Sequence, residues 1–259
     1  MKEAILLSEV SISFGDHLVL DRISFDVQEG EVLGIMGRGG SGKSLLLKII
    51  AGLVRPDSGE VFVAGKNLLD MSPPELRELR GKMGMLFQNY ALFDFLTVEE
   101  NIGFALKQSG RYSPEEIKTS VSEMLAALAL ENAEQLYPNE LSGGMKKRVG
   151  IGRATLHKPD IVLYDDPTAG LDPVTSSKIL NLLSKLQMEN GTTNTIASHD
   201  VPRLRQICDR FLLLNNGRVH YLGAMDDEES HISDPVMRPF VGISYAAENH
   251  MPSTEVHDR

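Results

Sequence analysis

The sequence predicts an α/β fold, with a mostly parallel sheet in the core, an N-terminal antiparallel β layer and an inserted helical subdomain. Residues 5–36 contain β-rich runs separated by turn residues such as Gly15-Asp16, a spacing that suggests antiparallel strands. A glycine-rich loop at 37–44 follows a short apolar run and precedes an apolar, helix-favouring run. Residues 89–140 show helical periodicity and no clear strand, so we expect the helical subdomain to interrupt the core there.

The β layer before the loop is expected to contain four short strands, at 5–7, 10–14, 18–20 and 23–27. Phe14 ends the second of these runs, just before a glycine turn. Its ring either stacks on an adenine or belongs to the core of a half-buried strand. The pattern alone leaves both interpretations open.

The glycine-rich loop has the residues that a phosphate-binding loop requires. It fits the pattern Gly, four residues, Gly-Lys-Ser/Thr, and its residues are Gly37, Arg38, Gly39, Gly40, Ser41, Gly42, Lys43 and Ser44. Glycines let several backbone N–H groups point inward, and the start of the following helix adds partial positive charge. The Lys43 ammonium can reach the β- and γ-phosphates, and the Ser44 hydroxyl can bind Mg2+. The loop therefore predicts a nucleotide site, where the alternative is a turn that binds nothing.

Polar residues follow three predicted strands beyond the loop. Gln88 follows the run at 83–87, Asp165 and Asp166 follow the run at 161–164, and His199 follows the run at 195–198. Two carboxylates at the end of a strand, in a chain with a phosphate-binding loop, suggest Mg2+ and water chemistry. The alternative is a solvated turn, because Asp-Pro pairs favour turns. His199 is placed at the same edge, because open α/β sheets bind ligands at the carboxyl ends of their strands.

The helical segment contains two stretches with alternative interpretations. Residues 91–96 are loop-like and apolar apart from Asp94, so they belong to the core or form a surface that docks a partner, which we expect at 93–96. Ser142, Gly143 and Gly144 open a basic helix, where they form a second anion cradle or only a flexible cap. Ser113 begins a capping box, which predicts the start of another helix.

Composition limits the classes of function. The chain has 259 residues and a formal net charge of −10, which argues against a protein that coats nucleic acid. One cysteine excludes an internal disulfide and fits a reducing compartment. No apolar run reaches the roughly 18 residues that cross a bilayer, and the start is too short for a secretory signal. If the protein acts at a membrane, we expect another chain to hold it there.

Taken together, these motifs resemble those of ABC transporter ATPases. The loop with Lys43, then Gln88, then Leu141-Ser142-Gly143-Gly144, then Asp165, then His199 follow one another in the order and rough spacing of that superfamily. The resemblance extends along nearly the whole chain. It implies that the ligands are ATP and Mg2+ and that the reaction is ATP hydrolysis coupled to transport.

The resemblance also implies a role for each motif residue. Phe14 stacks on the adenine, residues 37–44 hold the phosphates, and Ser142, Gly143 and Gly144 close on the γ-phosphate of a partner subunit. Ser44, Gln88 and Asp165 are the expected metal-site residues. The expected catalytic residues are Asp166 as the general base, His199 as the γ-phosphate sensor, Gln88 and Lys43. Two departures from the family pattern are Met145, where Gln is usual, and Asp166, where Glu is usual.

A narrower resemblance is to the Mla/Mce ATPases, which energise phospholipid or other lipid transport. It depends on Met145 after the signature, on the stretch 85–94 and on the tail from Asp234-Pro235 to Gly242. It implies a homodimer of ATPase subunits, an integral-membrane permease and an MCE-type lipid-binding protein. A small cytoplasmic accessory subunit is a further expected partner, and nucleic acid is not. The location implied is the cytoplasmic face of the inner membrane, where the permease holds the ATPase as a peripheral subunit.

Other functions remain alternatives. One alternative is the ATPase of an importer for amino acids or other small solutes. Because of Asp166, another is a hydrolysis-impaired subunit that opens or closes the transporter on nucleotide binding. Soluble ABC ATPases of DNA repair or translation fit poorly, because residues 45–141 are too few for a long coiled coil and the chain has a single cassette. We expect one ATPase domain at 1–230, with a helical subdomain at about 89–155. A tail at 231–259 is expected to dock on a neighbouring subunit through Met237, Phe240 and Val241.

Overall fold

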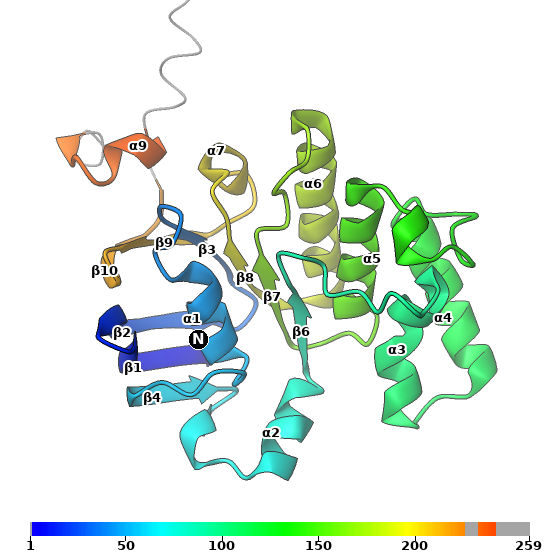
Figure 1. The fold of residues 1–259 in the computed structure, drawn as a ribbon, viewed down its shortest axis with the longest axis horizontal. Helices are drawn as coiled ribbons and strands as arrows, with labels where there is room; N and C mark the ends of the chain where they lie inside the picture. The colour runs from blue at the N-terminus through cyan, green and yellow to red at the C-terminus, as the bar shows by residue number, and fades with distance from the viewer. Residues whose placement is uncertain (1, 226–232, 242–259) are drawn as a thin grey trace, which may run out of the picture.

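The computed structural model describes residues 2–225 and 233–241, which form two sheets with helices packed against them (Figure 1). The predicted combination of an antiparallel layer, a largely parallel core sheet and a helical segment is confirmed. The strands are β1 (Glu3–Phe14), β2 (His17–Gln28), β3 (Val32–Met36), β4 (Ser58–Val63), β5 (Lys66–Asn67), β6 (Met83–Leu86), β7 (Ile161–Asp165), β8 (Thr193–Ala197), β9 (Arg210–Asn215) and β10 (Arg218–Gly223). The α-helices are α1 (Lys43–Ile50), α2 (Pro73–Arg80), α3 (Val98–Ser109), α4 (Pro114–Ala127), α5 (Gly143–Thr155), α6 (Pro173–Asn190), α7 (Val201–Leu204) and α9 (Arg238–Val241).

The antiparallel layer has the strand order β2-β1-β4-β5. The prediction of four short strands before the phosphate-binding loop is wrong, because β1 and β2 each run unbroken for 12 residues. Irregular pairing explains the difference: Glu9 and Arg22 both have φ of 49°, and the β1–β2 register shifts between Leu7 and Val10. Such bulges interrupt the alternation of apolar and polar residues, so one long strand resembles two short ones in the sequence.

The core sheet has the order β10-β9-β3-β8-β7-β6, and only β10 pairs antiparallel to its neighbour. Strands β3, β7 and β8 are buried along their whole length, as expected of parallel strands covered on both faces. Alternate residues of β3 enter different cores: Leu33 and Ile35 pack with α1 and the antiparallel layer, whereas Val32 and Met36 pack on the opposite face. The sheet therefore separates two hydrophobic cores.

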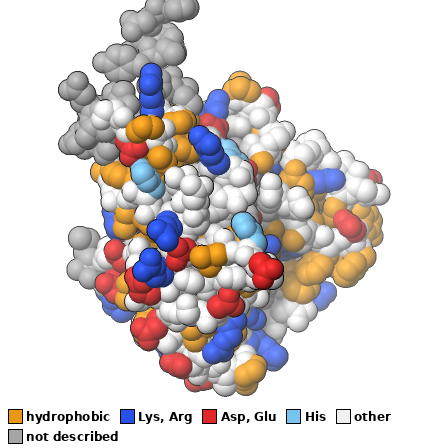
Figure 2. All heavy atoms as spheres, turned by 60° about the vertical axis from the view of Figure 1, so that its left-hand side comes forward, with side chains coloured by type: hydrophobic (Ala, Val, Ile, Leu, Met, Phe, Trp, Pro, Cys, Tyr) orange, Lys and Arg blue, Asp and Glu red, His pale blue; other side chains and the backbone are white. Residues whose placement is uncertain are grey.

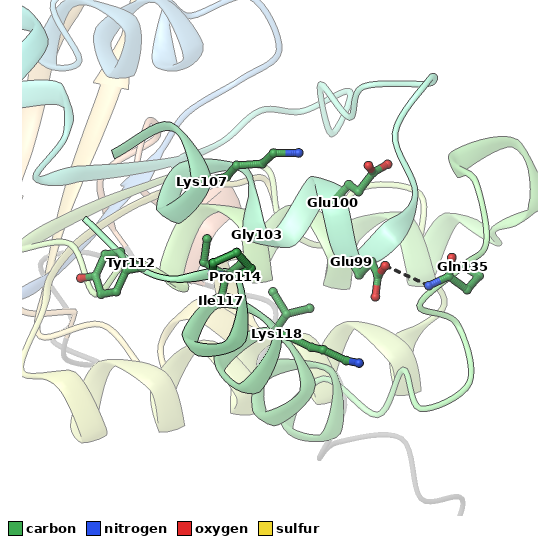
Figure 3. Close-up of a pocket in the computed structure, with 10 residues that line it drawn as sticks. Glu99, Glu100, Gly103, Lys107, Tyr112, Pro114, Ile117, Lys118 and Gln135 are labelled. Atoms are coloured by element: carbon green, nitrogen blue, oxygen red, sulfur yellow. Dashed lines mark hydrogen bonds between the residues drawn. The ribbon is translucent and has the colours of Figure 1, made fainter. Parts of the chain in front are cut away.

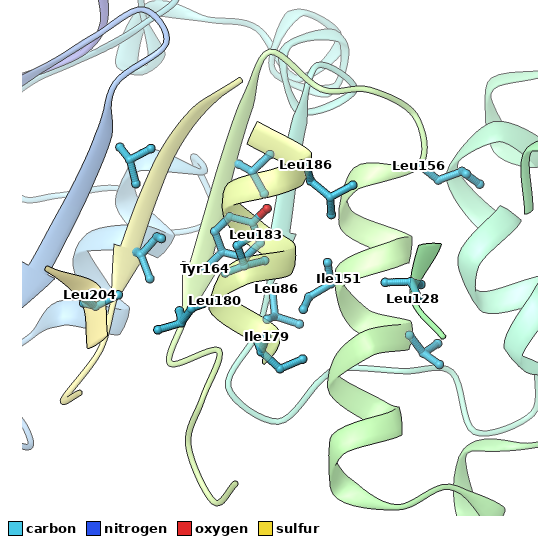
Figure 4. Close-up of a cluster of buried hydrophobic side chains, with 14 of the residues drawn as sticks. Leu86, Leu128, Ile151, Leu156, Tyr164, Ile179, Leu180, Leu183, Leu186 and Leu204 are labelled. Atoms are coloured by element: carbon cyan, nitrogen blue, oxygen red, sulfur yellow. The ribbon is translucent and has the colours of Figure 1, made fainter. Parts of the chain in front are cut away.

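Helices cover both faces of this sheet. Helix α1 contacts β4, β7 and β8, so it lies between the two sheets. Helices α5 and α6 lie on the other face, and α3 and α4 lie beyond α5 (Figure 1). Figure 4 shows part of the core there, where Tyr164 of β7, Leu183 of α6 and Ile151 of α5 belong to one buried cluster. No helix in the part of the chain that the structure describes is long and apolar enough to span a bilayer.

Figure 2 shows Lys and Arg side chains interspersed with Asp and Glu on the face of the molecule that it draws. Arg218 Nε donates to Asp21 Oδ2 at 2.7 Å, and Lys2 Nζ donates to Glu29 Oε1 at 2.6 Å. Exposed pairs of this kind contribute little to stability, but they neutralise the surface locally.

The described part of the C-terminal tail packs on its own chain. Met237 is 1% exposed and belongs to the core cluster, and Phe240 packs against that cluster. His220 of β10 is 2.7 Å from Asp234, measured between Nε2 and Oδ2. The apolar character of Met237 is thus accounted for within its own chain, whereas Phe240 is only half-buried. Docking by the rest of the tail stays a prediction, since most of 231–259 lies outside the described residues.

Candidate nucleotide-binding site

Four neighbouring parallel strands bring the predicted site residues to one edge of the core sheet. Strands β3, β8, β7 and β6 are adjacent in the sheet, so the segments after them meet at its carboxyl edge. A cavity of about 450 Å³ opens there, which is within the usual range for a small-molecule site. Its lining residues are Gly39, Gly40, Ser41, Gly42, Lys43, Ser44, Leu45, Lys48, Gln88, Asp165, Asp166, Ala197 and His199.

The glycine-rich loop after β3 has a backbone that other residues cannot adopt without strain. Gly37 has φ of 154°, and a Cβ there would lie 2.5 Å from the carbonyl oxygen of Leu214. Gly42 has φ of 100°, and a Cβ there would lie 2.6 Å from Leu20 Cδ2. Glycine is therefore required at both ends of the loop. Gly39 and Gly40 have no other atoms within 4 Å of their Cβ positions, so the loop is open on its ligand-facing side.

Lys43 lies across this loop. Its Nζ donates to the carbonyl oxygens of Gly37 at 2.9 Å and Arg38 at 3.0 Å, and the residue is 7% exposed. Burial lowers the pKa of the Lys43 ammonium, whereas the carboxylates of Asp166 and Asp165 act to raise it. A buried cation beside a glycine-rich loop at the start of a helix is a suitable partner for phosphate oxygens.

Ser44 and Asp165 form the side of the cavity suited to a metal ion. Ser44 Oγ donates to Asp165 Oδ1 at 2.8 Å, and Asp165 is 5% exposed. Burial raises the pKa of Asp165, and the Ser44 hydrogen bond opposes that shift. Among the described residues no three His, Cys, Asp or Glu side chains gather to hold a metal alone. The donors present still fit Mg2+, because this ion is commonly bound through one or two carboxylates together with substrate phosphates and waters.

Asp166 and His199 lie beside this pair. Asp166 has φ of 50°, which is uncommon outside glycine, and its N–H donates to Ala197 O at 2.8 Å. Its Oδ1 accepts a hydrogen bond from Ser198 Oγ at 3.2 Å, and its Oδ2 is 4.0 Å from His199 Nε2. Asp165 and Asp166 therefore do not form the solvated turn that remained an alternative. They present two carboxylates at the cavity, with Asp166 oriented by the segment after β8.

Phe14 and the signature residues lie outside this cavity. Phe14 is 59% exposed at the end of β1, so it is not a core residue. Ser142 caps α5, where its Oγ accepts the Met145 N–H at 3.3 Å, and Ser142 and Gly143 are exposed. Phe14, Ser142, Gly143 and Gly144 are not among the lining residues of the cavity. In a single chain these residues are therefore free to contact a ligand that is bound elsewhere than in this cavity.

A second cavity, of about 520 Å³, contains none of the predicted site residues. It lies between α3 and α4, where Lys107, Ile117 and Lys118 line it (Figure 3). Glu99 Oε1 accepts a hydrogen bond from Gln135 Nε2 at 2.9 Å across one end (Figure 3). It has no concentration of phosphate-binding groups comparable to the first cavity.

Sequence reasoning missed the residues that support the site without lining its cavity. Asp166 accepts hydrogen bonds from Lys147 and Ser198. In the loop after Gln88, Tyr90 accepts a hydrogen bond from Arg153 and its ring lies under the Lys147 ammonium. Lys147 stands in the run 146–148, which the sequence presents only as a basic helix. Its spacing of four residues from the buried Ile151 places both on one helix face, a signal that would have indicated burial.

Comparisons with known proteins agree with this geometry. The family model described as ABC transporter matches residues 20–169. The chain is 42% identical over 229 residues to the methionine import ATP-binding protein MetN of Carboxydothermus hydrogenoformans, covering 88% of this chain and 68% of the relative. It is 38% identical over 249 residues to the chloroplastic protein TRIGALACTOSYLDIACYLGLYCEROL 3 of Arabidopsis thaliana, covering 90% and 71%.

A solved structure is similar over nearly the same region. The dimeric ATP-binding cassette MJ0796, in a post-hydrolysis state bound to ADP and Pi, superposes with a TM-score of 0.80 at 35% identity. The match covers 86% of this chain and 99% of that structure. The chain therefore belongs to the ABC transporter family, as an ATP-binding ATPase subunit.

Proposed function

We propose that this chain supplies the ATP-hydrolysing half-sites of a membrane transporter and that the cavity at the carboxyl edge of the core sheet is its catalytic centre. One observation carries the proposal: Lys43, Ser44, Asp165, Asp166 and His199, which are far apart in the sequence, line the same cavity. Lys43 and the loop N–H groups bind the β- and γ-phosphates. Ser44, Asp165 and Gln88 hold the Mg2+, which supplies charge neutralisation at the phosphates.

Asp166 is proposed to take the proton of the attacking water, and His199 and Gln88 to orient the γ-phosphate and that water. Asp166 is one methylene shorter than glutamate, so it has to lie closer to the water or act through a second one. Errors of about 1 Å in position can cost on the order of a hundredfold in rate. We therefore expect hydrolysis that is slow but measurable, as opposed to a subunit that gates without hydrolysing.

ATP is proposed to bind between two copies of the chain. Phe14 and the phosphate-binding loop come from one copy, and Ser142, Gly143 and Gly144 come from the other. The support is that these signature residues lie outside the cavity of their own chain and are exposed or half-buried. Nucleotide that contacts both copies stabilises the closed dimer by its differential affinity for that state.

For the transported substrate, an amino acid or another small solute is the better supported class. The relative at 42% identity is named for methionine import, whereas the sequence analysis favoured lipid transport by an Mla/Mce-type system. No relative named above refers to an MCE-type partner, so that partner is not part of this proposal. The permease is proposed to hold the subunit at the cytoplasmic face of the inner membrane, with the loop at 93–96 in contact with it through its apolar side chains.

Lipid transport is a second candidate, and one specific observation favours it. The Arabidopsis relative, which carries the name of a galactolipid, matches 90% of this chain at 38% identity. The two candidates share the ATPase chemistry and differ only in the membrane partner and its cargo.

The ATPase assignment is tested by steady-state phosphate release from the purified chain with ATP and Mg2+. Lys43→Ala should abolish turnover, while Lys82→Ala, which removes an exposed cation outside the cavity, should retain it. Normal turnover by Lys43→Ala would refute the assignment. Asp166→Asn should retain ATP binding and keep only a small residual turnover, and Asp166→Glu should match or exceed the native rate. Turnover by Asp166→Glu but none by the native protein would favour the gating alternative.

The cargo is tested on the complex isolated from native membranes. Its permease is identified by mass spectrometry, and the complex is reconstituted in vesicles with methionine or with labelled phospholipid. Stimulation of phosphate release by methionine supports the small-solute candidate. Phospholipid transfer without that stimulation supports the lipid candidate.

A further inference from the structure

Helix α5 contains a buried lysine that takes no part in the proposed phosphate contacts. Lys147 is 1% exposed, and its Nζ donates to the backbone carbonyl oxygen of Asp166 at 2.6 Å. The same Nζ lies 5.6 Å from the centroid of the Tyr90 ring, over its face. Burial lowers the pKa of Lys147, whereas the carboxylates of Asp166 and Asp165 act to raise it. A charged group is costly to bury unless it is paired and hydrogen-bonded, so its partners indicate what it does.

The partner, Asp166, has a backbone conformation that is uncommon outside glycine. Asp166 has φ of 50°, and residues held in that region persist only where their surroundings determine the conformation. The Asp166 N–H is held by Ala197 O at 2.8 Å, and its carbonyl oxygen is held by Lys147. With both peptide groups anchored, the direction of the Asp166 side chain into the cavity is set. Ser198 Oγ then meets that side chain at 3.2 Å.

The helix that carries Lys147 also holds the loop after Gln88. Arg153 donates to Tyr90 O at 2.9 Å and to Ala91 O at 2.5 Å. Tyr90 and Ala91 have φ of 62° and 48°, so this loop, like Asp166, has an uncommon backbone. A Cβ at Gly143 would lie 3.7 Å from the Tyr90 hydroxyl oxygen, which places the ring beside the start of α5. One helix therefore begins at the signature, supports the Gln88 loop and reaches Asp166.

We propose that Lys147 is a positioning residue that ties the backbone of Asp166 to helix α5 and so places the Asp166 carboxylate for catalysis. The inference rests on the proposed role of Asp166 as the general base. Lys147 itself is not among the residues that line the nucleotide cavity, so its removal should not weaken the phosphate contacts. Its effect is on the rate of hydrolysis and not on the binding of nucleotide.

The test compares three forms of the full chain, in the same assembly used for phosphate release. Lys147→Met keeps the length of the side chain and removes its charge and N–H donors, and Lys147→Arg restores a cation. Lys146→Met is the matched control, because Lys146 is the adjacent lysine on the same helix and is only half-buried. For each form we measure kcat, the affinity for ATP and the thermal unfolding midpoint.

We expect Lys147→Met to lower kcat by roughly ten- to a hundredfold, the scale of a 1 Å displacement, while ATP affinity stays within about twofold. Lys147→Arg should recover part of the rate, and Lys146→Met should retain all of it. In the Asp166→Asn background, adding Lys147→Met should lower the residual rate no further, because the group that Lys147 positions is already absent.

Other outcomes overturn the inference. A native kcat for Lys147→Met does so directly, and so does an equal loss of rate in the Asp166→Asn background. If Lys147→Met does not fold, Lys147→Gln replaces it, and failure of both would assign Lys147 to core stability alone. Failure of the proposed function would give a different result: Asp166→Asn, with Lys147 intact, would then hydrolyse ATP at the native rate.

Discussion

Replacing Gly84 with alanine should separate the two elements that carry Gln88 and the signature. Gly84 lies in β6, and a Cβ there would be 2.0 Å from the carbonyl oxygen of Ala154 in α5 and 3.2 Å from Pro159 Cγ. Contacts of real Cβ atoms essentially never fall below 3.0 Å, so strand and helix have to move apart by about 1 Å. The Ala154 oxygen is part of the helix backbone and cannot rotate away as a side chain would.

The structure sets the scale of the effect. Overpacking of a core costs about 1–3 kcal/mol, and each kcal/mol lowers the Tm of a domain of this size by about 2–4 °C. We therefore expect the Tm of Gly84→Ala to fall by roughly 2–12 °C. Strand β6 leads directly to Gln88 and α5 begins after Ser142, so the same 1 Å displacement should lower kcat by about ten- to a hundredfold.

The assays are calorimetric unfolding, nucleotide titration and steady-state phosphate release. ATP affinity should change little, because Gly84 belongs to neither β3 nor α1, which hold the phosphate-binding loop. Gly103→Ala in α3 is the matched control: its Cβ would meet only side-chain atoms of Val121 and Ile117, at 3.1 and 3.2 Å. Those side chains can yield by a few tenths of an ångström, so Tm and kcat should remain close to native. A native Tm and kcat in Gly84→Ala would refute the reasoning.

Three further predictions follow from single side chains. Phe14→Ala should weaken ATP binding by roughly fivefold to a hundredfold, the range of one aromatic–base stack, with little change in Tm because Phe14 is 59% exposed; isothermal titration measures this. Phe95 is 77% exposed, and its ring is tilted against that of Phe93 with the centroids 5.8 Å apart, so in Phe95→Ser the isolated ATPase should be unaffected while assembly with the permease or transport by the complex is lost. Burial lowers the pKa of His157 below its ordinary 6.5, so the unfolded state binds more protons than the native state below that pH. The free energy of unfolding should therefore decrease as pH falls below about 6.5, His157→Gln should remove that part of the decrease, and His17→Gln, at an exposed position, should not.

The location of the site could be predicted because its residues belong to short local patterns. Residues 37–44 and the polar residues Gln88, Asp165, Asp166 and His199 at the ends of β6, β7 and β8 were identified from the sequence, and all of them except Gly37 and Arg38 line the cavity. Parallel strands bring their carboxyl ends to one edge, so residues 121 positions apart, such as Ser44 and Asp165, hydrogen-bond at 2.8 Å. The role of Phe14 was open in the sequence, and its exposure excludes the core interpretation.

The supports of the site were not predictable in the same way. Glu9 and Arg22 show no signal of a bulge, because the left-handed backbone there is imposed by pairing between strands. Lys147 stands in a basic run that is typical of a solvated helix face, yet it is buried against Asp166. Met237 was expected to face another subunit, yet it is buried in the hydrophobic core of its own chain.

By itself the sequence determined the fold class, the glycine-rich loop and the identity of the polar groups at the strand ends. These depend on residue types and spacings within a few positions, through backbone preference and the periodicity of apolar residues. Only the tertiary structure decided which of these groups share a cavity, which backbone carbonyl a buried ammonium meets, and which apolar residues are exposed. Those outcomes depend on contacts between distant segments, and the energy of a buried charge or a left-handed aspartate is set by the partner that packing supplies.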